Sequence, residues 1–404
     1  MRRRMAWWSA AVLVTGPFAH GEEFSWQDGG SGLAMIRFTN SVPVIFTAVR
    51  VELDHFNKDF SLITTLASNT VAGTEPLANQ LKRLPKESGT PVAAINGDFF
   101  MMSGAAKGDP RGLHILNGEL VSVAAGPAAF WQDKHGQLHG EPVSSKLTVT
   151  WPNRETDLAG LNEELGTNSM VLFTPRMGAL YNVTNTPSSN RRGRTGSLIP
   201  KGGPIRPPGG REWVLEPAGS GPWLPLRIGH TYHARTAASF DGFTNVPPGK
   251  MIMSVGSNLL ARLPEITNGT AITISTATEP DLTGIQSGLG TGPMLVREGK
   301  PYEVTARMSE QPHPRAALGW NGKHLYLAVA DGRQKQISVG IRLSEMADFM
   351  IALGCDEAID LDGGQSTTLM LNGAVINQPT NGRHDVANGI VILRQRSGDE
   401  DAND

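Results

Sequence analysis

Residues 358–368 read Ala-Ile-Asp-Leu-Asp-Gly-Gly-Gln-Ser-Thr-Thr. In this run Asp362 is followed at once by Gly363 and Gly364, and then by hydroxyl side chains that begin at Ser366. Adjacent glycines let the backbone approach a ligand closely and direct its amides at negative charge. A carboxylate beside such amides suggests acid or base chemistry on an anionic or hydroxyl-rich substrate. The run fits equally well a tight turn after a strand, in which the carboxylate caps neighbouring amides.

Two further clusters share this design, with polar side chains two positions apart. The pairs are Asn96 with Asp98, His313 with Arg315, and Asp360 with Asp362. Residues i and i+2 of an extended strand point to the same face, so each pair presents a polar edge. Three such edges that converge would build one site.

Five motifs together resemble the phosphodiester glycosidase family. In chain order they are Asn-Gly-Asp-Phe-Phe from Asn96, Gly-Thr-Gly-Pro from Gly290, Pro-Arg-Ala-Ala-Leu-Gly from Pro314, Leu-Asp-Gly-Gly-Gln-Ser-Thr-Thr from Leu361, and Val-Ala-Asn-Gly from Val386. Their order and approximate spacing match the family over residues 92–393. The resemblance implies hydrolysis of a sugar-1-phosphodiester, of the N-acetylglucosamine-1-phosphodiester type, at the anomeric C–O bond. Two departures, Ala316 in place of Thr and Gln365 in place of Gly, bear on the substrate and on the shape of the anion-binding loop.

Asp98, Arg315 and Asp362 are the catalytic residues that the resemblance implies. A guanidinium can grip two phosphate oxygens at once, so Arg315 would stabilise the departing phosphate; alternatively it forms a buried pair with a structural carboxylate. The two carboxylates would activate water or attack C1, and orient a hydroxyl or share a proton. The sequence does not say which carboxylate has which role.

Substrate binding is expected from a wider set of residues. They are Asn96, Gly292, His313, Gly363, Gly364, Ser366 and Asn388. The two asparagines would bind sugar hydroxyls or an acetamido group, or else cap backbone groups. His313 would carry a proton or brace Arg315. No cofactor is expected to be required, although a divalent cation held by Asp98, Asp362 and backbone carbonyls stays open.

Two other function classes fit the same residues. A metal-dependent phosphodiesterase would cut P–O instead of C–O, and a noncatalytic carbohydrate-binding protein would serve exopolysaccharide or cell-wall assembly. Charged residues are 18% of the chain and the formal net charge is -2, so the composition indicates no nucleic-acid-binding surface. The expected partner is a glycan or sugar-phosphodiester substrate.

The start of the chain is typical of an export signal. Three arginines follow Met1, the apolar stretch 6–14 comes next, and residues 19–21 offer a cleavage site. We expect residues 1–21 to be a signal peptide, no stable membrane span after its removal, and a periplasmic or secreted protein; an uncleaved anchor is the alternative. The chain has one cysteine, Cys355, so no disulfide forms within it, and we expect this residue to pack in the core.

We expect one catalytic domain over residues 22–395, with a loop-rich insertion around 141–250 and an acidic tail at 396–404. The insertion contains the basic run Arg-Arg-Gly-Arg at 191–194. This run is either a solvated loop or a flap that meets phosphate groups.

Turn chemistry dominates the predicted secondary structure. Asn-Gly pairs begin at Asn96, Asn117, Asn268, Asn321, Asn372 and Asn381, and Asp-Gly pairs at Asp241 and Asp331. Such pairs favour hairpins. Helices are expected at 76–84, with Thr74 as a possible cap, and at 344–353, capped by Ser344 and ended by Gly354. Together these patterns and the family resemblance predict an α+β fold of β-rich mixed sheets with a few packed helices.

Overall fold

The structure is a computed structural model that describes ten ranges of the chain. They are residues 13–14, 24–40, 42–56, 58–104, 106–152, 154–178, 209–241, 245–303, 311–382 and 384–395. Apart from a two-residue strand, the predicted signal peptide lies outside the described residues. The basic run at 191–194 and the acidic tail at 396–404 also lie outside them.

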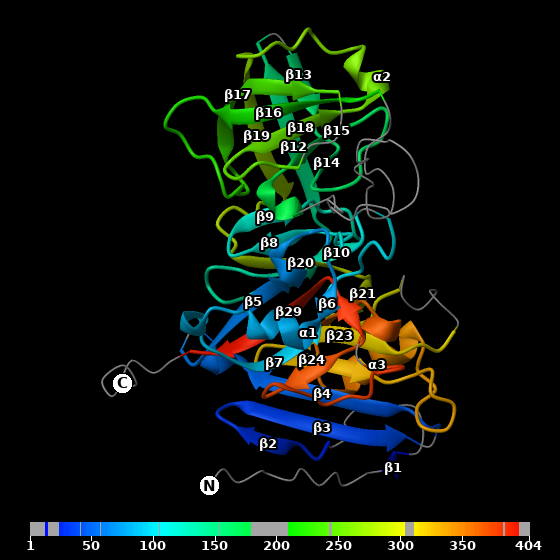
Figure 1. Ribbon diagram of the computed structural model, residues 1–404. Helices are drawn as coiled ribbons and strands as arrows, with labels where there is room; N and C mark the ends of the chain where they lie inside the picture. Colours follow the sequence, from blue (N-terminus) through cyan, green and yellow to red (C-terminus); the bar gives the residue numbers. More distant parts are fainter. Residues whose placement is uncertain are drawn as a thin grey trace, which may run out of the picture.

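A nine-stranded sheet lies in the lower part of the molecule in Figure 1. Its strands run in the order β1 (Leu13–Val14), β3 (Leu33–Asn40), β4 (Ile45–Glu52), β24 (His324–Ala330), β23 (Arg315–Trp320), β25 (Glu357–Leu361), β21 (Met294–Arg297) and β22 (Lys300–Pro301), with β2 (Gln27–Gly30) paired to β3. The strands β23 and β24 are almost wholly buried. Their continuous apolar runs fit strands that are covered on both faces.

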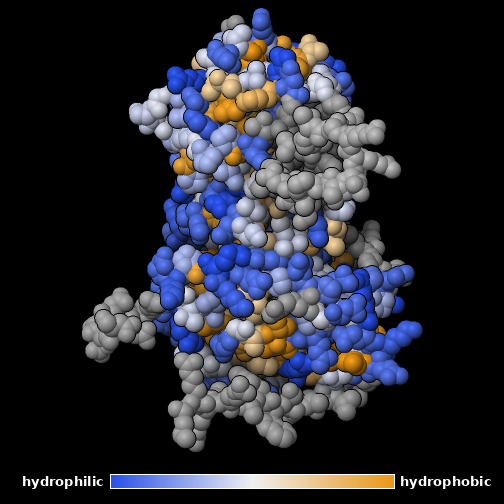
Figure 2. All heavy atoms as spheres, viewed as in Figure 1, coloured by the Kyte–Doolittle hydropathy of each residue, from blue (hydrophilic) through white to orange (hydrophobic). Residues whose placement is uncertain are grey.

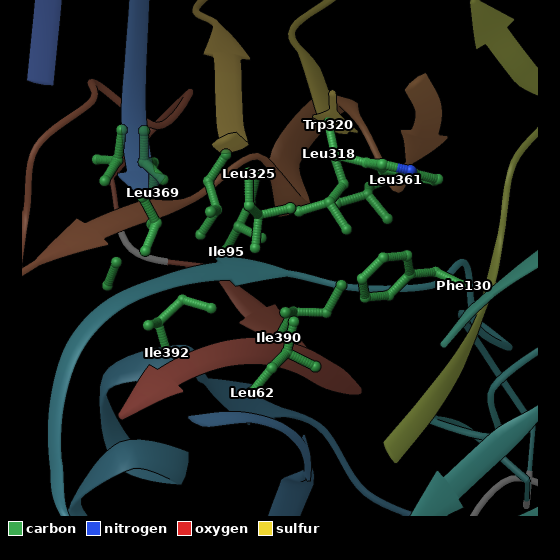
Figure 3. Close-up of a cluster of buried hydrophobic side chains, with 14 of the residues drawn as sticks. Leu62, Ile95, Phe130, Leu318, Trp320, Leu325, Leu361, Leu369, Ile390 and Ile392 are labelled. Atoms are coloured by element: carbon green, nitrogen blue, oxygen red, sulfur yellow. The ribbon is translucent and has the colours of Figure 1, made fainter. Parts of the chain in front are cut away.

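A five-stranded sheet packs against one face of the nine-stranded sheet. Its order is β27 (Ala374–Val375), β26 (Leu369–Leu371), β7 (Thr90–Asn96), β29 (Asn388–Arg394) and β5 (Phe60–Leu66). Figure 3 shows the shared core, in which Ile95 and Ile390 of the smaller sheet lie near Leu318 and Leu361 of the larger one. The predicted site motifs lie at the ends of these same strands, so this sandwich positions the site.

Two helices cover the outer faces of the sandwich. Helix α3 (Leu343–Ala352) packs Phe349 and Met350 on the nine-stranded sheet, in the cluster that also buries Cys355. Helix α1 (Leu77–Lys82) places Leu77 on the smaller sheet.

The helix ends differ from the predicted caps. The cap residue of α3 is Arg342, not Ser344, and the Glu345 carboxylate accepts a hydrogen bond from the Arg342 amide at 2.8 Å. Gly354 follows the end of α3 with a φ of 91°, as predicted. Pro76 precedes the first residue of α1, and no side chain caps that helix. These one- or two-residue shifts leave the apolar faces of both helices unchanged.

Two more sheets extend the molecule upward in Figure 1. The middle sheet has the order β11 (Leu138–Glu141), β10 (Ala128–Gln132), β20 (Ser287–Thr291), β8 (His114–Leu116) and β9 (Glu119–Ser122). The upper sheet has the order β13 (Arg154–Asp157), β12 (Ser144–Trp151), β19 (Ala271–Glu279), β17 (Thr231–Phe240), β16 (Arg211–Pro217), β18 (Met251–Val255), β15 (Met170–Phe173) and β14 (Gly160–Leu161). A short pair, β6 (Glu75–Pro76) with β28 (Asp385–Val386), lies beside α1.

The upper sheet corrects the expectation of a loop-rich segment around 141–250. The described residues of this range contain six strands, β12 to β17. Strand β17 explains the error, since its buried residues Tyr232, Ala234 and Thr236 alternate with exposed polar ones. When the buried face of a strand carries small or weakly polar residues such as Ala and Thr, the sequence shows no apolar run. The alternation of buried and exposed positions is then easily missed.

Among the described residues the fold is mostly β, with short helices α1, α2 (Ser257–Leu260) and α3. The β-rich part of the prediction is therefore confirmed, whereas helices contribute less than an α+β class implies. The hairpin signals at Asn117 and Asn372 are also confirmed, because both have positive φ and both join paired strands. Within the same ranges, no helix has the length and apolarity needed to cross a bilayer.

Candidate active site

The predicted motifs meet where strands of the two sandwich sheets end. Strand β7 ends at Asn96, its neighbour β29 begins at Asn388, and β25 ends one residue before Asp362. The Asp362 amide donates a hydrogen bond to the carbonyl oxygen of Gly97 at 2.9 Å, which links the two sheets at this point. Segments from both halves of the chain thus form one polar cluster.

Asn96 joins the two motifs that contain the carboxylates. Its side chain is fully buried, and its Nδ2 donates to the Asp362 carbonyl oxygen at 2.7 Å. Its Oδ1 accepts a hydrogen bond from the Thr368 amide at 2.9 Å. Both the nitrogen and the oxygen of the side-chain amide therefore contact backbone groups. Of the two roles that the sequence left open, this arrangement fits capping and not sugar binding.

Asn388 holds the Asp98 segment in the same way. This fully buried side chain accepts a hydrogen bond from the Asp98 amide at 2.8 Å, and its Nδ2 lies 3.3 Å from Nδ1 of His114. A Cβ at Gly97 would clash with the side-chain oxygen of Asn388. The glycine of the Asn-Gly pair at residue 96 is therefore needed for this close contact, and the pair does not form a hairpin turn. Asn388 thus sets the position of Asp98.

Asp98 is a deeply buried carboxyl group. The side chain is 3% exposed, and its Oδ2 accepts a hydrogen bond from the Gly112 amide at 2.7 Å. Burial raises the pKa of Asp98 to about 7; the negative charge of Asp362 raises it further, while amide hydrogen bonds and Arg111 oppose the rise. Near neutral pH a substantial fraction of Asp98 carries a proton.

Asp362 is the more accessible member of the pair. Burial raises the pKa of this carboxyl group to about 6, and hydrogen bonds from the Ser366 hydroxyl and the Gly363 amide, together with Arg111, limit the rise. Asp362 is therefore mostly ionised at pH 7, whereas Asp98 is not. Environments that separate two carboxyl pKa values are the usual basis for different acid and base roles.

The two glycines after Asp362 are used within the protein. The Gly364 amide donates to the Pro314 carbonyl oxygen at 2.9 Å, and a Cβ at Gly363 would lie 2.7 Å from that oxygen. The Gly363 amide serves the Asp362 carboxylate. These glycines therefore allow close backbone packing around Asp362, and neither of the two amides is left for a separate anion. Gly292 is similar, because a Cβ there would lie 2.7 Å from Oδ2 of Asp360.

Arg315 is buried, whereas the predicted contact with a bound phosphate needs an accessible guanidinium. The residue is 8% exposed, and its Nε donates to the Ile341 carbonyl oxygen at 3.2 Å. Its charge acts on Asp360, a buried carboxyl group. Burial raises the pKa of Asp360 to about 8, and the positive charge of Arg315 opposes this rise. This arrangement matches the alternative that the sequence left open, a buried pairing with a structural carboxylate.

His313 lies beside cationic groups and not beside the carboxylates. Its Nδ1 is 3.4 Å from Nη2 of Arg333. Burial, Arg333 and Arg315 lower the pKa of His313, so the imidazole is neutral at pH 7. Its backbone pairs with Ile341, the residue that also receives the Arg315 hydrogen bond. Bracing Arg315 is the role that fits this position.

Sequence reasoning missed Arg111. This exposed residue lies on the loop between β7 and β8, where its amide donates to the Phe99 carbonyl oxygen at 2.9 Å. Its charge favours the ionised forms of both Asp98 and Asp362. Arg111 is therefore the cation that acts on both carboxylates. The local sequence Gly-Asp-Pro-Arg-Gly at 108–112, a charged turn shortly after Asp98, was the available signal.

Asp109 was also missed. It is 6% exposed, and its Oδ1 has no hydrogen-bond partner among the described residues. Burial raises the pKa of Asp109 to about 8, and the charges of Glu163 and Asp98 add to the rise. The loop folds back so that the Met101 amide donates to the Asp109 carbonyl oxygen at 2.9 Å. A further carboxyl group with a raised pKa thus lies near Asp98.

A cavity of about 360 Å³ lies beside Ser366, whose hydroxyl donates to Asp362. It is lined by Thr74, Phe100, Met102, Lys107, Gln365, Ser366, His384 and Asp385. Since Ser366 lines this cavity and donates to Asp362, the cavity leads to that carboxylate. We refer to it as the polar cavity. Within the described ranges, no group of three or more His, Cys, Asp or Glu side chains is arranged to hold a metal ion.

The model of the phosphodiester glycosidase family matches residues 229–393. This segment is similar to the phosphodiester glycosidase family. It is less than half of the chain; it includes Arg315, Asp362 and Asn388, whereas Asp98 precedes it. The family resemblance drawn from the motifs is confirmed, and this match supports a hydrolase of this kind.

Relatives with assigned activities match over a short stretch. The human N-acetylglucosamine-1-phosphodiester alpha-N-acetylglucosaminidase is 43% identical over 67 residues, which is 16% of this chain and 13% of the human protein. The bovine protein of the same name is 42% identical over 67 residues, which is 12% of its length. This chain therefore matches only about an eighth of the length of either relative.

Two crystal structures resemble the whole fold. A hypothetical protein from Synechocystis has a TM-score of 0.68 at 18% identity, covering 93% of this chain and 64% of that one. A protein of Burkholderia pseudomallei, whose name describes it as exported, has a TM-score of 0.63 at 19% identity, covering 87% of this chain and 74% of that one. At these identities the comparison establishes the fold alone.

Proposed function

We propose that this protein is an exported hydrolase that cleaves a sugar-1-phosphodiester, of the N-acetylglucosamine-1-phosphodiester type, at the anomeric C–O bond. One observation carries the proposal: two interacting carboxyl groups, Asp98 and Asp362, have pKa values raised to about 7 and about 6, and Ser366, which donates to Asp362, lines an accessible cavity. Paired carboxyl groups of unequal acidity are what glycoside hydrolysis requires. The family of residues 229–393 supports the same reaction class.

The unequal pKa values suggest a division of labour. Asp362, ionised and hydrogen-bonded by Ser366, would activate the attacking water or attack C1. Asp98, which retains a proton near pH 7, would donate to the departing phosphate oxygen or to a sugar hydroxyl. A phosphate monoester anion leaves readily, so a weak acid suffices for this second role.

Arg111 is our candidate for the phosphate contact, in place of Arg315. The guanidinium of Arg111 is exposed and acts on both carboxylates, so a phosphate bound beside them would meet it. Lys107 on the same loop lines the polar cavity and adds a second cation. We assign Arg315 and His313 to positioning: Arg315 interacts with the buried Asp360 carboxyl group, and His313 supports Arg315.

Export is part of the proposal, with a periplasmic or secreted mature protein. The basic and apolar start of the chain supports it, as does the fold shared with the Burkholderia protein. Cell fractionation of the expressed full chain tests this point, and amino-terminal sequencing of the product locates any cleavage.

Oxygen-18 labelling tests the reaction. The protein from residue 22 onward would be incubated in labelled water with an N-acetylglucosamine-1-phospho-alkyl diester and with uridine diphosphate N-acetylglucosamine, with and without chelator. We expect the label on the sugar, because C–O cleavage transfers the water oxygen to C1. Label on phosphate, lost with chelator, would establish a metal-dependent phosphodiesterase instead.

An Asp362→Asn variant separates catalysis from binding. We expect this isosteric change to abolish label incorporation while retaining affinity for the diester, measured by calorimetry. Binding by the wild-type protein without any turnover would favour the noncatalytic carbohydrate-binding alternative. Glu164→Gln is the matched control, since Glu164 is an exposed carboxylate in the same region.

A further inference from the structure

A second cavity, of about 230 Å³, lies close to the polar cavity. Its lining residues are Pro76, Leu77, Ala78, Thr368, Val375, Pro379, Gly382 and His384. Most of these described side chains are apolar. We call it the apolar cavity.

The two cavities adjoin one another. His384 lines both. In the β6–β28 pair, Pro76 lies in register with Asp385, and these two residues belong to the apolar and the polar cavity respectively. On the other side, Thr368 of the apolar cavity follows Ser366 of the polar cavity by two residues. The apolar cavity is therefore next to the polar cavity, whose wall includes the Asp362 partner Ser366.

The apolar cavity also opens to the surface. Val375, on the edge strand β27, is 40% exposed, which makes it one of few exposed large hydrophobic side chains among the described residues. Figure 2 shows a gathering of apolar side chains on the lower half of a face that is otherwise largely hydrophilic. Exposed apolar surface beside a polar site commonly marks ligand contact.

We propose that the apolar cavity binds the aglycone of the substrate, and that this aglycone is an aliphatic alcohol. This inference rests on the proposed function. A phosphodiester has one sugar arm and one aglycone arm, so a phosphate held near Lys107 and Arg111 directs the second arm away from Asp362. The cavity next to the polar cavity is lined by Leu77, Ala78 and Val375. An alkyl chain would be buried there, whereas a second sugar would leave its hydroxyl groups without partners.

The reaction on such a substrate balances simply. Water adds to C1 of the sugar as the bond between C1 and the bridging oxygen breaks. The bridging oxygen keeps the electron pair and stays with the phosphate, and the proton lost by water returns through the carboxyl pair. The products are the free sugar and an alkyl phosphate monoester. His384, partly buried at the junction and held by the Thr380 carbonyl oxygen, is placed to contact the phosphate of the second product.

Aglycone chain length gives the test. N-acetylglucosamine-1-phosphodiesters with methyl, butyl and octyl aglycones would be compared at equal concentration. If methylene groups are buried, kcat/KM should rise by about four-fold per methylene until the cavity is filled. Equal kcat/KM for methyl and octyl diesters with the wild-type protein would overturn the proposal.

The variant Ala78→Asp places a charge in the apolar cavity and leaves the carboxylate pair unaltered. We expect turnover of the methyl diester to persist and the preference for octyl to disappear. Asn79→Asp on the same helix is the matched control, because residue 79 does not line the cavity. An equal loss on both diesters, or retention of the octyl preference, would contradict the assignment; thermal unfolding of each variant reports whether α1 is intact.

Failure of the proposed function would be distinguishable. If no diester is cleaved, the proposed function is wrong. The aglycone assignment is then tested separately, by comparing the binding of octyl phosphate and methyl phosphate in calorimetry. We expect the octyl compound to bind the wild-type protein at least ten-fold more tightly than Ala78→Asp. Equal binding by the two proteins would overturn the aglycone assignment.

Discussion

The Gly112 amide donates a hydrogen bond to Oδ2 of Asp98 at 2.7 Å, and a Cβ at residue 112 would lie 3.0 Å from the same oxygen. The loop that follows Asp98 thus returns to contact it. This hydrogen bond favours the ionised form of Asp98 and lowers its pKa, whereas burial favours the protonated form and raises its pKa. The balance leaves the pKa of Asp98 within the pH range in which the site would work.

The pH dependence of kcat/KM should be bell-shaped with its maximum between about pH 6 and 7. Activity should rise as Asp362 ionises near pH 6 and fall as Asp98 loses its proton near pH 7. Ser366→Ala removes a hydrogen bond to ionised Asp362, so it should move the acidic limb to higher pH and leave the basic limb in place. Initial rates from pH 4 to 9 would check this, and a shift of the basic limb alone would contradict the assignment.

Arg111→Met should lower kcat/KM by about a hundred-fold, because it removes a charged contact to the phosphate in the transition state. It should also move the acidic limb of the pH profile upward, since Arg111 favours the ionised form of Asp362. Arg211→Met, at an exposed arginine paired with Asp241 at 2.8 Å, is the control. Unchanged kinetics for Arg111→Met would return the phosphate contact to Arg315.

Asp109→Asn should stabilise the protein at pH 8 more than at pH 4. The pKa of Asp109 in the folded state, about 8, is above the ordinary aspartate value of 3.8, so the folded state binds the proton more tightly. Its contribution to stability is present below pH 4 and is lost as pH rises toward 8, and asparagine does not titrate. Thermal unfolding at several pH values checks this: the Tm difference between variant and wild type should grow with pH, and a constant difference would show that Asp109 is not the titrating group.

Gly97→Ala should destabilise the fold by about 1–3 kcal/mol and reduce activity, because its Cβ would meet Asn388 and lie 2.7 Å from a methyl of Leu289. Displacing Asn388 would also displace the Asp98 amide. Gly322→Ala is the control, since a Cβ there meets nothing within 4 Å. Denaturant unfolding measures both variants, and equal stability would mean that the segment at residue 97 adapts without cost.

The sequence predicted the part of the site that short motifs encode. The convergence of the Asp98 and Asp362 segments followed from paired polar residues at strand ends, and hairpins followed from Asn-Gly pairs. The functions of Arg111 and Arg315 could not be assigned from the chain. Arg111 acts on the Asp98 and Asp362 pair because the 99–112 loop folds back, and Arg315 acts on Asp360 because both are buried between strands. Similarly, strand β17 is defined by one buried face, which only its neighbours reveal.

Strand β7 lies between β26 and β29, both drawn from the last part of the chain, and the Asp98 amide is held by a side chain 290 residues away. The smaller sheet therefore closes late, only after almost the whole polypeptide is available, because forming contacts of such long sequence separation is entropically slow. Until then the apolar strand 90–96 has no partners. Folding of this chain should accordingly be limited by the arrival of its carboxyl-terminal strands, and truncation before residue 388 should leave an aggregation-prone chain, not an inactive but folded one.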